Sequence, residues 1–192
     1  LAMKTVVEKE KYLHLKQALV DRLIVEAGRI RGVEDQTGVF YSAKAVVVTT
    51  GTFLNGLIHI GTVHYPAGRA GEIASVSLAE CLKSLGFDIG RMKTGTPPRL
   101  RASTIDFLQM ERQDSDPAPE PFSFTTTKLR QERLPSYFTA TTPETHRFIG
   151  DNINKSPLYS GIIKGVSARY CPSLEDKVMR FTDKSKHPVV LE

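Results

Sequence analysis

The feature that most constrains the fold is a largely apolar run, Ala43–Thr50, which ends directly before Gly51. Its residues do not alternate between apolar and polar types, a pattern typical of a strand buried on both faces of a parallel sheet. Open parallel sheets bind their ligands at the carboxyl ends of their strands. The run therefore predicts an α/β domain with a ligand near Gly51.

The segments before this run have the pattern of antiparallel strands. Turn residues at Ala27–Gly28 and at Gln36–Gly38 separate them. A three-stranded β-meander that leads into a buried strand ending in Thr-Gly is the layout of two-dinucleotide-binding flavoproteins, and a generic α/β domain is the alternative. The predicted strands are Leu13–Leu19, Asp21–Glu26, Arg29–Glu34 and Gly38–Ser42.

Three helices are also predicted in the stretch before residue 154. Residues 1–10 have the pattern of a helix end, and Ser77–Leu85 forms a helix closed by Gly86, with Cys81 packed inside it. Thr142 can cap a helix over Pro143–Ile153. With an acidic, proline-rich connector at 114–121, the sequence predicts three parts: residues 1–100 from a FAD-binding domain, 101–168 as an inserted α/β subdomain, and 169–192 returning to the cofactor-binding core.

Composition excludes several classes of protein. The hydrophobic content of 40% suffices for a core, and no segment has the length of a membrane-spanning helix. Only Cys81 and Cys171 occur, which argues against a disulfide scaffold and favours a reducing, cytoplasmic setting. The histidines are scattered, so no metal site is expected.

A basic segment indicates a polyanionic partner. The net charge of +5 suits such a partner without requiring one. Four cations lie within the loop-like stretch 90–101, which has few acidic neighbours. These residues are candidates for contacts with phosphates of RNA or of a nucleotide, and an ordinary solvated loop is the alternative. They are Arg91, Lys93, Arg99 and Arg101.

The second cysteine lies just before a predicted helix start. Pro172 and the pair Ser173 and Asp176 approximate a capping box, and cations lie on both sides, at Arg169 and Lys177. Helix N-termini and nearby cations stabilise a thiolate, so Cys171 is a candidate reactive cysteine. A buried structural cysteine is the alternative.

Four segments together resemble one family: Thr50–Gly61, Gly68–Gly71, Gly90–Arg99 and Arg169–Phe181, in this order and spacing. On these residues the chain resembles the GidA/MnmG proteins, the flavoprotein subunit of an enzyme that modifies the wobble uridine of tRNA. The similarity covers the whole chain as a segment from the first half of the family's length. We therefore expect a fragment of a longer protein.

The resemblance implies a glutathione-reductase-like, two-dinucleotide-binding fold and a cytoplasmic homodimer. It implies an enzyme that adds a carboxymethylaminomethyl group to carbon 5 of the wobble uridine, using FAD, NADH and a one-carbon unit from methylene-tetrahydrofolate. The implied partners are tRNA and a GTPase of the MnmE type. The G-x-G-x-x-G fingerprint of a flavin domain does not occur in the sequence, so this chain alone is expected to hold little flavin and to be inactive.

The resemblance also implies roles for individual residues. Val20 and Ser75 match positions that contact FAD, and Cys171 matches a cysteine regarded as catalytically important. Ser167-Ala168 stand where the family has Gly-Pro, and Pro188 lies in a segment that departs from the family pattern. The segment that matches the NAD site comprises Ser167, Ala168, Arg169, Tyr170, Cys171, Pro172, Ser173, Leu174, Glu175, Asp176, Lys177, Val178, Met179, Arg180 and Phe181.

Other functions fit the sequence less well. A folate- and FAD-dependent tRNA uracil methyltransferase, which lacks the GTPase partner, is disfavoured by the full 169–181 motif and by the long inserted region. A disulfide reductase is disfavoured because no C-x-x-C or C-x-x-x-x-C pair occurs. A non-catalytic fragment that binds RNA or a partner is the alternative from another class.

Overall fold

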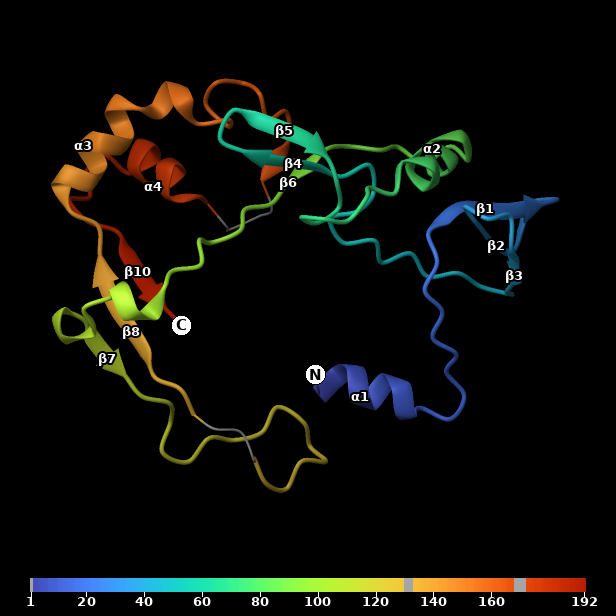
Figure 1. Cartoon of the computed structure of the whole chain (residues 1–192), viewed down its shortest axis with the longest axis horizontal. Helices are drawn as coiled ribbons and strands as arrows, with labels where there is room; N and C mark the ends of the chain where they lie inside the picture. Colours follow the sequence, from blue (N-terminus) through green and yellow to red (C-terminus); the bar gives the residue numbers. More distant parts are fainter. Residues whose placement is uncertain (1, 130–132, 168–171) are drawn as a thin grey trace. The chain divides into compact units, whose positions relative to one another are not determined.

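The computed structural model describes residues 2–129, 133–167 and 172–192. The chain divides into two compact units, one up to Gly90 and one from Arg91 to Glu192. Figure 1 traces their helices and strands in chain order.

The first unit contains the predicted meander. Strands β1 (Val20–Glu26), β2 (Arg29–Asp35) and β3 (Phe40–Ser42) form an antiparallel sheet in the order β1-β2-β3. Ala27 and Gly28 join the first two strands, with φ of 49° and 72°. Two consecutive positive φ angles give the turn a twist that matches the flanking strands. The prediction of a three-stranded meander is confirmed.

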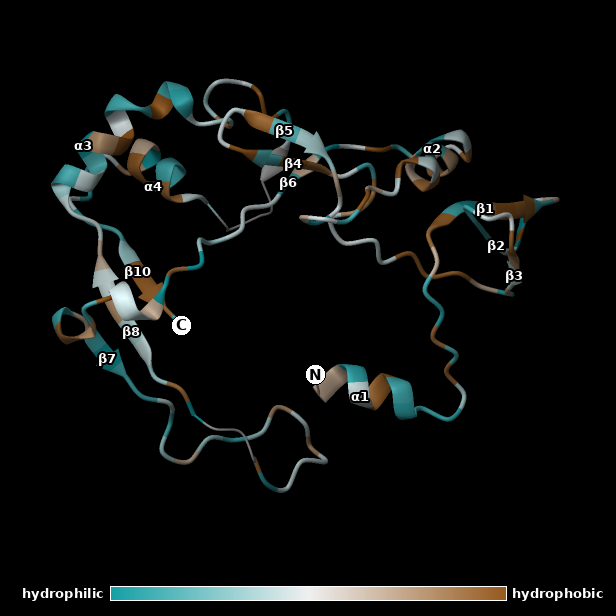
Figure 2. Ribbon diagram, viewed as in Figure 1, coloured by the Kyte–Doolittle hydropathy of each residue, from teal (hydrophilic) through white to brown (hydrophobic). Residues whose placement is uncertain are grey.

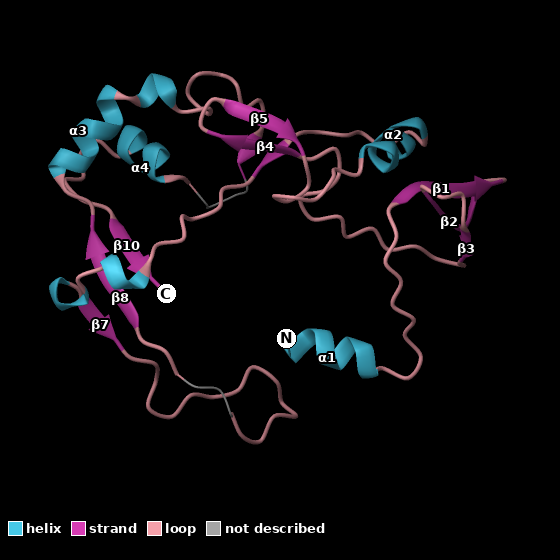
Figure 3. Cartoon of the chain, in the orientation of Figure 1, coloured by secondary structure: helices cyan, strands magenta, loops and turns pink. Residues whose placement is uncertain are grey.

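Two predicted strands are wrong. Leu13–Leu19 lies outside every strand, and its Leu15 is 58% exposed. Ala43–Thr50 is likewise a loop in the structure (Figure 3), and Val47 is 85% exposed. A parallel strand needs a neighbour along its edge, and no described segment pairs with Ala43–Thr50. Apolar composition alone indicated a strand there, but strand pairing decides whether one forms.

Helices α1 (Ala2–Lys9) and α2 (Val76–Ser84) confirm two predicted helices. Helix α2 packs against β1 and buries Leu78 and Leu82. Leu85 has the spacing of this buried face, yet it is the C-cap residue and is 40% exposed. The buried face of α2 therefore ends at Leu82.

A hairpin between the meander and α2 was not predicted. Strands β4 (Leu57–Ile60) and β5 (Val63–Pro66) pair antiparallel across a turn at Gly61, where φ is 58°. Each strand has only four residues, and glycines flank the pair on both sides. The alternation of apolar and polar residues in strands this short cannot be recognised among the surrounding turn residues.

The second unit is built around a sheet in the order β10-β8-β7. It consists of β7 (Glu111–Gln113), β8 (Ser136–Ala140) and β10 (Pro188–Leu191), all antiparallel. Strand β10 is strongly hydrophobic in Figure 2. It begins with a proline and lies at the sheet edge, where a missing N–H costs no interior hydrogen bond.

The second unit also contains short elements outside this sheet. Helices α3 (Pro143–Asp151) and α4 (Leu174–Arg180) pack against each other. Strands β6 (Met92–Lys93) and β9 (Val166–Ser167) form a separate parallel pair. The described part of the unit also contains three 3₁₀ turns: η1 (Ala102–Thr104), η2 (Phe107–Gln109) and η3 (Ile153–Lys155).

The predicted cap of α3 is confirmed. The Thr142 hydroxyl accepts a hydrogen bond from the Thr145 amide at 3.2 Å, and the Thr145 hydroxyl accepts one from the Thr142 amide at 3.4 Å. This reciprocal arrangement is a capping box, with threonine replacing the usual Glu or Gln. Pro143 occupies the first turn, where a helix needs no N–H.

Replacement of Thr142 by alanine should lower the free energy of unfolding of the second unit by about 1 kcal/mol, because the Thr145 amide at the start of the helix loses its acceptor. Chemical denaturation followed by circular dichroism measures this decrease. The control is Thr127→Ala, the same change in an exposed loop of this unit. Equal stability of Thr142→Ala and the control would contradict the role of the cap.

Candidate functional site

Val20, the first predicted FAD contact, is the first residue of β1 and is half-buried. It lies opposite Asp35, the last residue of β2. The amide of Gln36, in the turn after β2, donates to the carbonyl of Leu19 at 2.9 Å. The position of Val20 therefore depends on the conformation of that turn.

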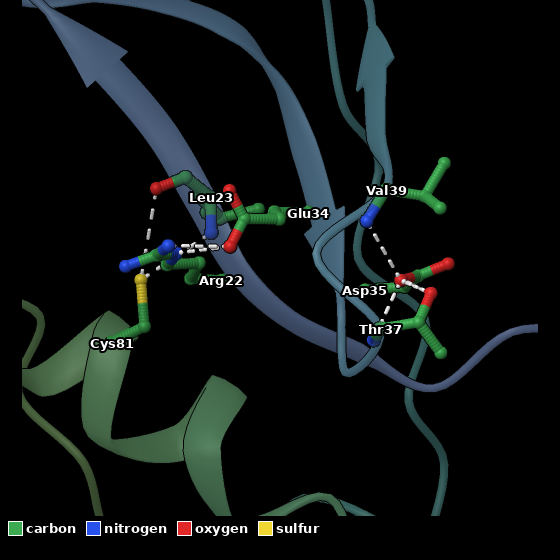
Figure 4. Close-up of polar contacts among 7 residues, drawn as sticks. All are labelled: Arg22, Leu23, Glu34, Asp35, Thr37, Val39 and Cys81. Atoms are coloured by element: carbon green, nitrogen blue, oxygen red, sulfur yellow. Dashed lines mark hydrogen bonds and ion pairs between the residues drawn. The ribbon is translucent and has the colours of Figure 1, made fainter.

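Asp35 fixes the turn. Its side chain is buried, and Oδ1 accepts hydrogen bonds from the Thr37 amide (2.9 Å), the Thr37 hydroxyl (2.6 Å) and the Val39 amide (3.1 Å). Oδ2 accepts from the Tyr41 hydroxyl at 3.0 Å. Figure 4 shows this carboxylate facing Thr37 and Val39.

These bonds favour the charged carboxylate. The hydrogen bond from the Thr37 hydroxyl is the main cause that lowers the pKa of Asp35 below its ordinary 3.8, against the opposing effect of burial. The same network raises the pKa of Tyr41, chiefly through its hydrogen bond to Asp35. Asp35 is therefore a structural anchor of the turn beside Val20. The sequence prediction missed this role, although an Asp before a turn often accepts a hydrogen bond from the amide two residues on.

Cys81 packs inside α2, as predicted from the sequence. It is half-buried, and its Sγ accepts a hydrogen bond from the Leu23 amide of β1 at 3.4 Å (Figure 4). Beside it, Arg22 and Glu34 form an ion pair across β1 and β2, with Nε and Oε1 2.9 Å apart. Cys81 thus joins the helix to the sheet.

An open hollow of about 710 Å³ lies between this helix and the meander. Its lining includes Asp21, Glu34, Asp35 and Glu80 but a single arginine, Arg22. A surface with this charge balance repels phosphate groups. The hollow is therefore not a candidate for the pyrophosphate of a dinucleotide.

Ser75, the second predicted FAD contact, closes a glycine-rich loop. Its amide donates to the carbonyl of Phe53 at 2.8 Å, and its carbonyl accepts from the amide of Asn55 at 3.0 Å. These bonds join the segment before β4 to the start of α2. Ser75 is 7% exposed and is the N-cap residue of α2, yet its hydroxyl makes no capping hydrogen bond.

Gly68 allows this loop to close. A Cβ at this position would lie 2.1 Å from the ring of Phe53, so only glycine fits beneath the ring. The Thr52 hydroxyl donates to the Gly68 carbonyl at 2.6 Å, and the Gly68 amide donates to the carbonyl of Glu72. The family-like segments 50–61 and 68–71 are therefore parts of one folded loop.

The second unit brings together two of the sequence candidates. Strands β6 and β9 pair in parallel, with Met92 opposite Val166 and Lys93 opposite Ser167. The basic segment therefore meets the start of the segment predicted to bind NAD. Arg91 packs against Gly165. A Cβ at Gly165 would lie 3.1 Å from the carbonyl oxygen of Arg91.

The structure does not gather the other two cations at this pair. Arg99 is exposed in the loop after β6. Arg101 is the N-cap residue of η1, where its carbonyl accepts from the Thr104 amide at 2.9 Å. Both guanidinium groups belong to exposed residues, available to a large partner.

Four of the predicted NAD-site residues lie outside the described part of the chain: Ala168, Arg169, Tyr170 and Cys171. The remainder of that segment forms the end of β9 and helix α4 with its flanks. On α4 the side chain of Val178 is buried, whereas Leu174 and Met179 are 37% and 38% exposed. Leu174 and Met179 are therefore the apolar side chains of α4 that a ligand can reach.

Asp176 anchors α4. It is 3% exposed, and its Oδ1 accepts from the Tyr159 hydroxyl at 3.1 Å and lies 3.5 Å from Nε of Arg180. Burial, followed by the bond to Asp176, raises the pKa of Tyr159. These contacts orient the helix, so the Asp176 carboxylate faces the protein.

The predicted capping box of α4 is wrong. Ser173 is the N-cap residue, but it makes no capping bond to the helix amides. Its hydroxyl instead donates to Oδ2 of Asp176 at 3.4 Å. This hydrogen bond orients the hydroxyl toward the buried carboxylate, and no helix amide donates to its oxygen.

The described residues form neither a metal site nor a membrane span. In residues 2–129, 133–167 and 172–192, no three His, Cys, Asp or Glu side chains are placed to hold a metal ion. No helix over the same ranges is long and apolar enough to cross a bilayer.

Residues 1–192 match the family described as Glucose inhibited division protein A. The chain is 52% identical over 190 residues to the tRNA uridine 5-carboxymethylaminomethyl modification enzyme MnmG of Thermodesulfovibrio yellowstonii, covering 99% of this chain and 30% of that protein. It is 51% identical over 190 residues to the MnmG of Bacillus subtilis, with the same coverage. The chain thus spans about 30% of the length of these curated relatives.

Solved structures of the same family are also similar to this chain. Aquifex aeolicus GidA in its form I crystal matches all of this chain and 33% of its own, with a TM-score of 0.89 and 44% identity. The form II crystal gives a TM-score of 0.86 and 41% identity, and covers all of this chain and 31% of its own. The fold is that of an α/β flavoprotein, as predicted. The chain belongs to the glucose-inhibited division protein A family, and the resemblance found in the sequence is confirmed.

Replacement of Asp35 by alanine should lower the free energy of unfolding of the first unit, because the turn beside Val20 loses its acceptor. The wild-type carboxylate, with its lowered pKa, stabilises the fold above pH 3.8 and loses that effect as the pH falls below this value. Denaturation of the two proteins at a series of acidic pH values measures both effects.

The matched control is Asp88→Ala, which removes an exposed carboxylate of the same unit. We expect the stability of Asp35→Ala to vary less with acid than that of the wild type, and that of Asp88→Ala to follow the wild type. An Asp35→Ala protein with wild-type stability at neutral pH would refute the anchoring role.

Proposed function

We propose that this chain is part of an FAD- and NADH-dependent enzyme that adds a carboxymethylaminomethyl group to carbon 5 of the wobble uridine of tRNA. The observation that carries the proposal is the parallel pairing of β6 with β9. It sets basic residues beside the segment predicted to bind NAD. Membership of a family whose relatives are named for this modification supports it.

FAD would contact the first unit at Val20 and Ser75. The hydroxyl of Ser75 makes no capping hydrogen bond to the helix amides. This hydroxyl and the first-turn amides of α2 suit a polar, anionic ligand, because helix N-termini favour negative charge. The backbone at Gly71, with φ of 81°, has open space where a Cβ would lie. A ligand can therefore approach the loop closely.

NADH would bind along β9 and α4 in the second unit. Lys93 lies opposite Ser167 and supplies a cation for the pyrophosphate. The exposed side chains of Leu174 and Met179 supply apolar contact for the rings. Asp176 orients this helix through Tyr159. The other residues of Ser167–Phe181 complete the proposed site.

When bound, NADH and FAD supply the reducing equivalents with which a one-carbon unit from methylene-tetrahydrofolate is joined to the uracil. Carbon 5 of uracil is a poor nucleophile. Cys171 would activate this carbon, either by adding its thiolate to carbon 6 or by acting as an acid–base group for the proton at carbon 5. The cysteine lies three residues before Leu174, the first residue of α4.

The exposed cations at Arg99 and Arg101, with Arg91, would contact tRNA phosphates. We further propose a cytoplasmic homodimer that works with a GTPase of the MnmE type. In the full-length protein, residues 1–100 would belong to the FAD-binding domain and 101–168 to an inserted subdomain. Residues 169–192 would return to the cofactor-binding core.

Replacement of Cys171 by serine in the full-length protein should abolish tRNA modification and leave the flavin absorbance of the purified protein intact. Mass spectrometry of tRNA nucleosides measures the product, in reactions with FAD, NADH, methylene-tetrahydrofolate and the GTPase. Cys81→Ser is the control, because Cys81 packs against β1, and it should remain active. Full modification by Cys171→Ser would remove Cys171 from the mechanism, and a methylated uridine made without the GTPase would overturn the proposed reaction.

Reversal of charge at Arg99 and Arg101, each to glutamate, should weaken tRNA binding and reduce its salt dependence. For duplex regions, the slope of log affinity against log salt becomes shallower by about 0.9 for each phosphate that the protein no longer neutralises. Arg29→Glu, an exposed arginine of the first unit, is the control. An unchanged slope in the double variant would show that these two residues do not bind tRNA.

A further inference from the structure

A histidine cluster joins three elements of the second unit, and none of its members belongs to the proposed cofactor contacts. Thr141 follows β8 and His187 precedes β10. The Thr141 amide donates to the His187 carbonyl at 2.9 Å, and the His187 amide donates to the Thr141 hydroxyl at 2.8 Å. Nε2 of His146, on α3, lies 2.7 Å from the same hydroxyl.

The two imidazole rings are in contact. Their centroids are 5.1 Å apart with an interplanar angle of 27°, so the rings stack. The ring of Phe181, the C-cap residue of α4, meets His187 edge-on at 6.5 Å. His187 therefore lies between the sheet, α3 and α4.

The surroundings of the His187 ring disfavour a second proton on it. Its residue is 4% exposed, and Nε2 is buried without a hydrogen-bond partner. A charged imidazole carries a proton on both nitrogens, so protonation would leave a buried N–H donor unsatisfied. An unsatisfied donor next to a positive charge is costly in a low-dielectric interior.

The groups that face His187 are also unfavourable to charge. His146 faces it from α3, Lys177 from α4, and Lys184 from the segment after α4, whereas Thr141, directly after β8, is neutral. Burial is the largest cause that lowers the pKa of His187 below its ordinary 6.5, followed by the charges of His146, Lys177 and Lys184. Hydrogen bonding with the Lys177 backbone acts in the opposite direction and is the weakest of these causes.

We propose that neutral His187 is a positioning residue that holds α4 on the end of the β10-β8-β7 sheet, and that acid releases the helix. The inference rests on the proposed function, because α4 and its flanks carry the proposed NADH contacts. It assigns to the stacked pair of His146 and His187 a control over the affinity for NADH. The pair touches no ligand itself.

The sign of the effect follows from the two states. When α4 is released, His187 is hydrated and takes up a proton near its ordinary pKa of 6.5. When α4 is docked, His187 resists the proton until the pH falls to the lowered value. Docking is therefore fully favoured above pH 6.5 and weakens as the pH falls through the interval below it. In that interval, linkage to one proton changes the docking equilibrium by up to about tenfold per pH unit.

Hydrogen exchange of the α4 amides in the full-length protein, corrected for the intrinsic pH dependence of exchange, tests the proposal. We expect protection over Leu174–Arg180 to fall between about pH 7 and about pH 5, on either side of the ordinary histidine pKa. His187→Gln cannot take up a proton, so its α4 protection should not vary with pH. His14→Gln, an exposed histidine of the first unit, is the matched control and should follow the wild type.

A second variant keeps the proposal testable where His187→Gln does not fold. His146→Gln removes one of the facing charges, so the acid-dependent loss of protection should become smaller and begin at the same pH. Wild-type protection that does not change with pH would overturn the proposal. A His187→Gln protein that retains the wild-type acid dependence would overturn it as well.

NADH titration at the same pH values separates this inference from the proposed function. If the inference is correct, the wild-type affinity falls with acid and the His187→Gln affinity does not. Absence of NADH binding at every pH would refute the proposed function, and the exchange experiment would still decide the role of His187. NADH binding with α4 protection that is constant over pH would refute the inference alone.

Discussion

The parallel pairing of Met92–Lys93 with Val166–Ser167 is the interaction on which the candidate site of the second unit depends. Parallel strands need a long crossover connection, and here residues 94–165 supply it. That connection folds β7, β8 and α3 within itself and returns the chain beside the basic segment. This connection thus brings Lys93 next to the proposed NADH segment.

Polar anchors hold the described elements more than a large apolar core does. The buried apolar side chains are few: Ala67, Leu78, Ala79, Leu82 and Val178. Buried polar groups lie at the points where segments meet. Asp35 fixes the turn beside Val20, and Asp176 fixes α4. Each is satisfied by several hydrogen bonds, which keeps a buried carboxylate favourable and gives the backbone around it one conformation.

The sequence predicted local structure well and long-range structure poorly. The meander, α2 and the capped α3 were predictable because each depends on neighbouring residues, such as Ala27-Gly28 in a turn and Thr142 before Pro143. The strand expected at Ala43–Thr50 was not, since a strand depends on a partner that composition does not reveal. The family motifs pointed to the candidate residues. The structure added the pairing of Lys93 with Ser167 and the stacking of His146 on His187, which join residues distant in sequence.

We propose that two cofactors bind separate parts of this chain, FAD in the first unit and NADH in the second. A crystal structure of the full-length protein with both cofactors bound would test this proposal. We expect atoms of FAD within about 4 Å of Val20 and Ser75, and atoms of NADH at that distance from Lys93, Leu174 and Met179. Either cofactor bound against other residues, with these positions empty, would contradict it.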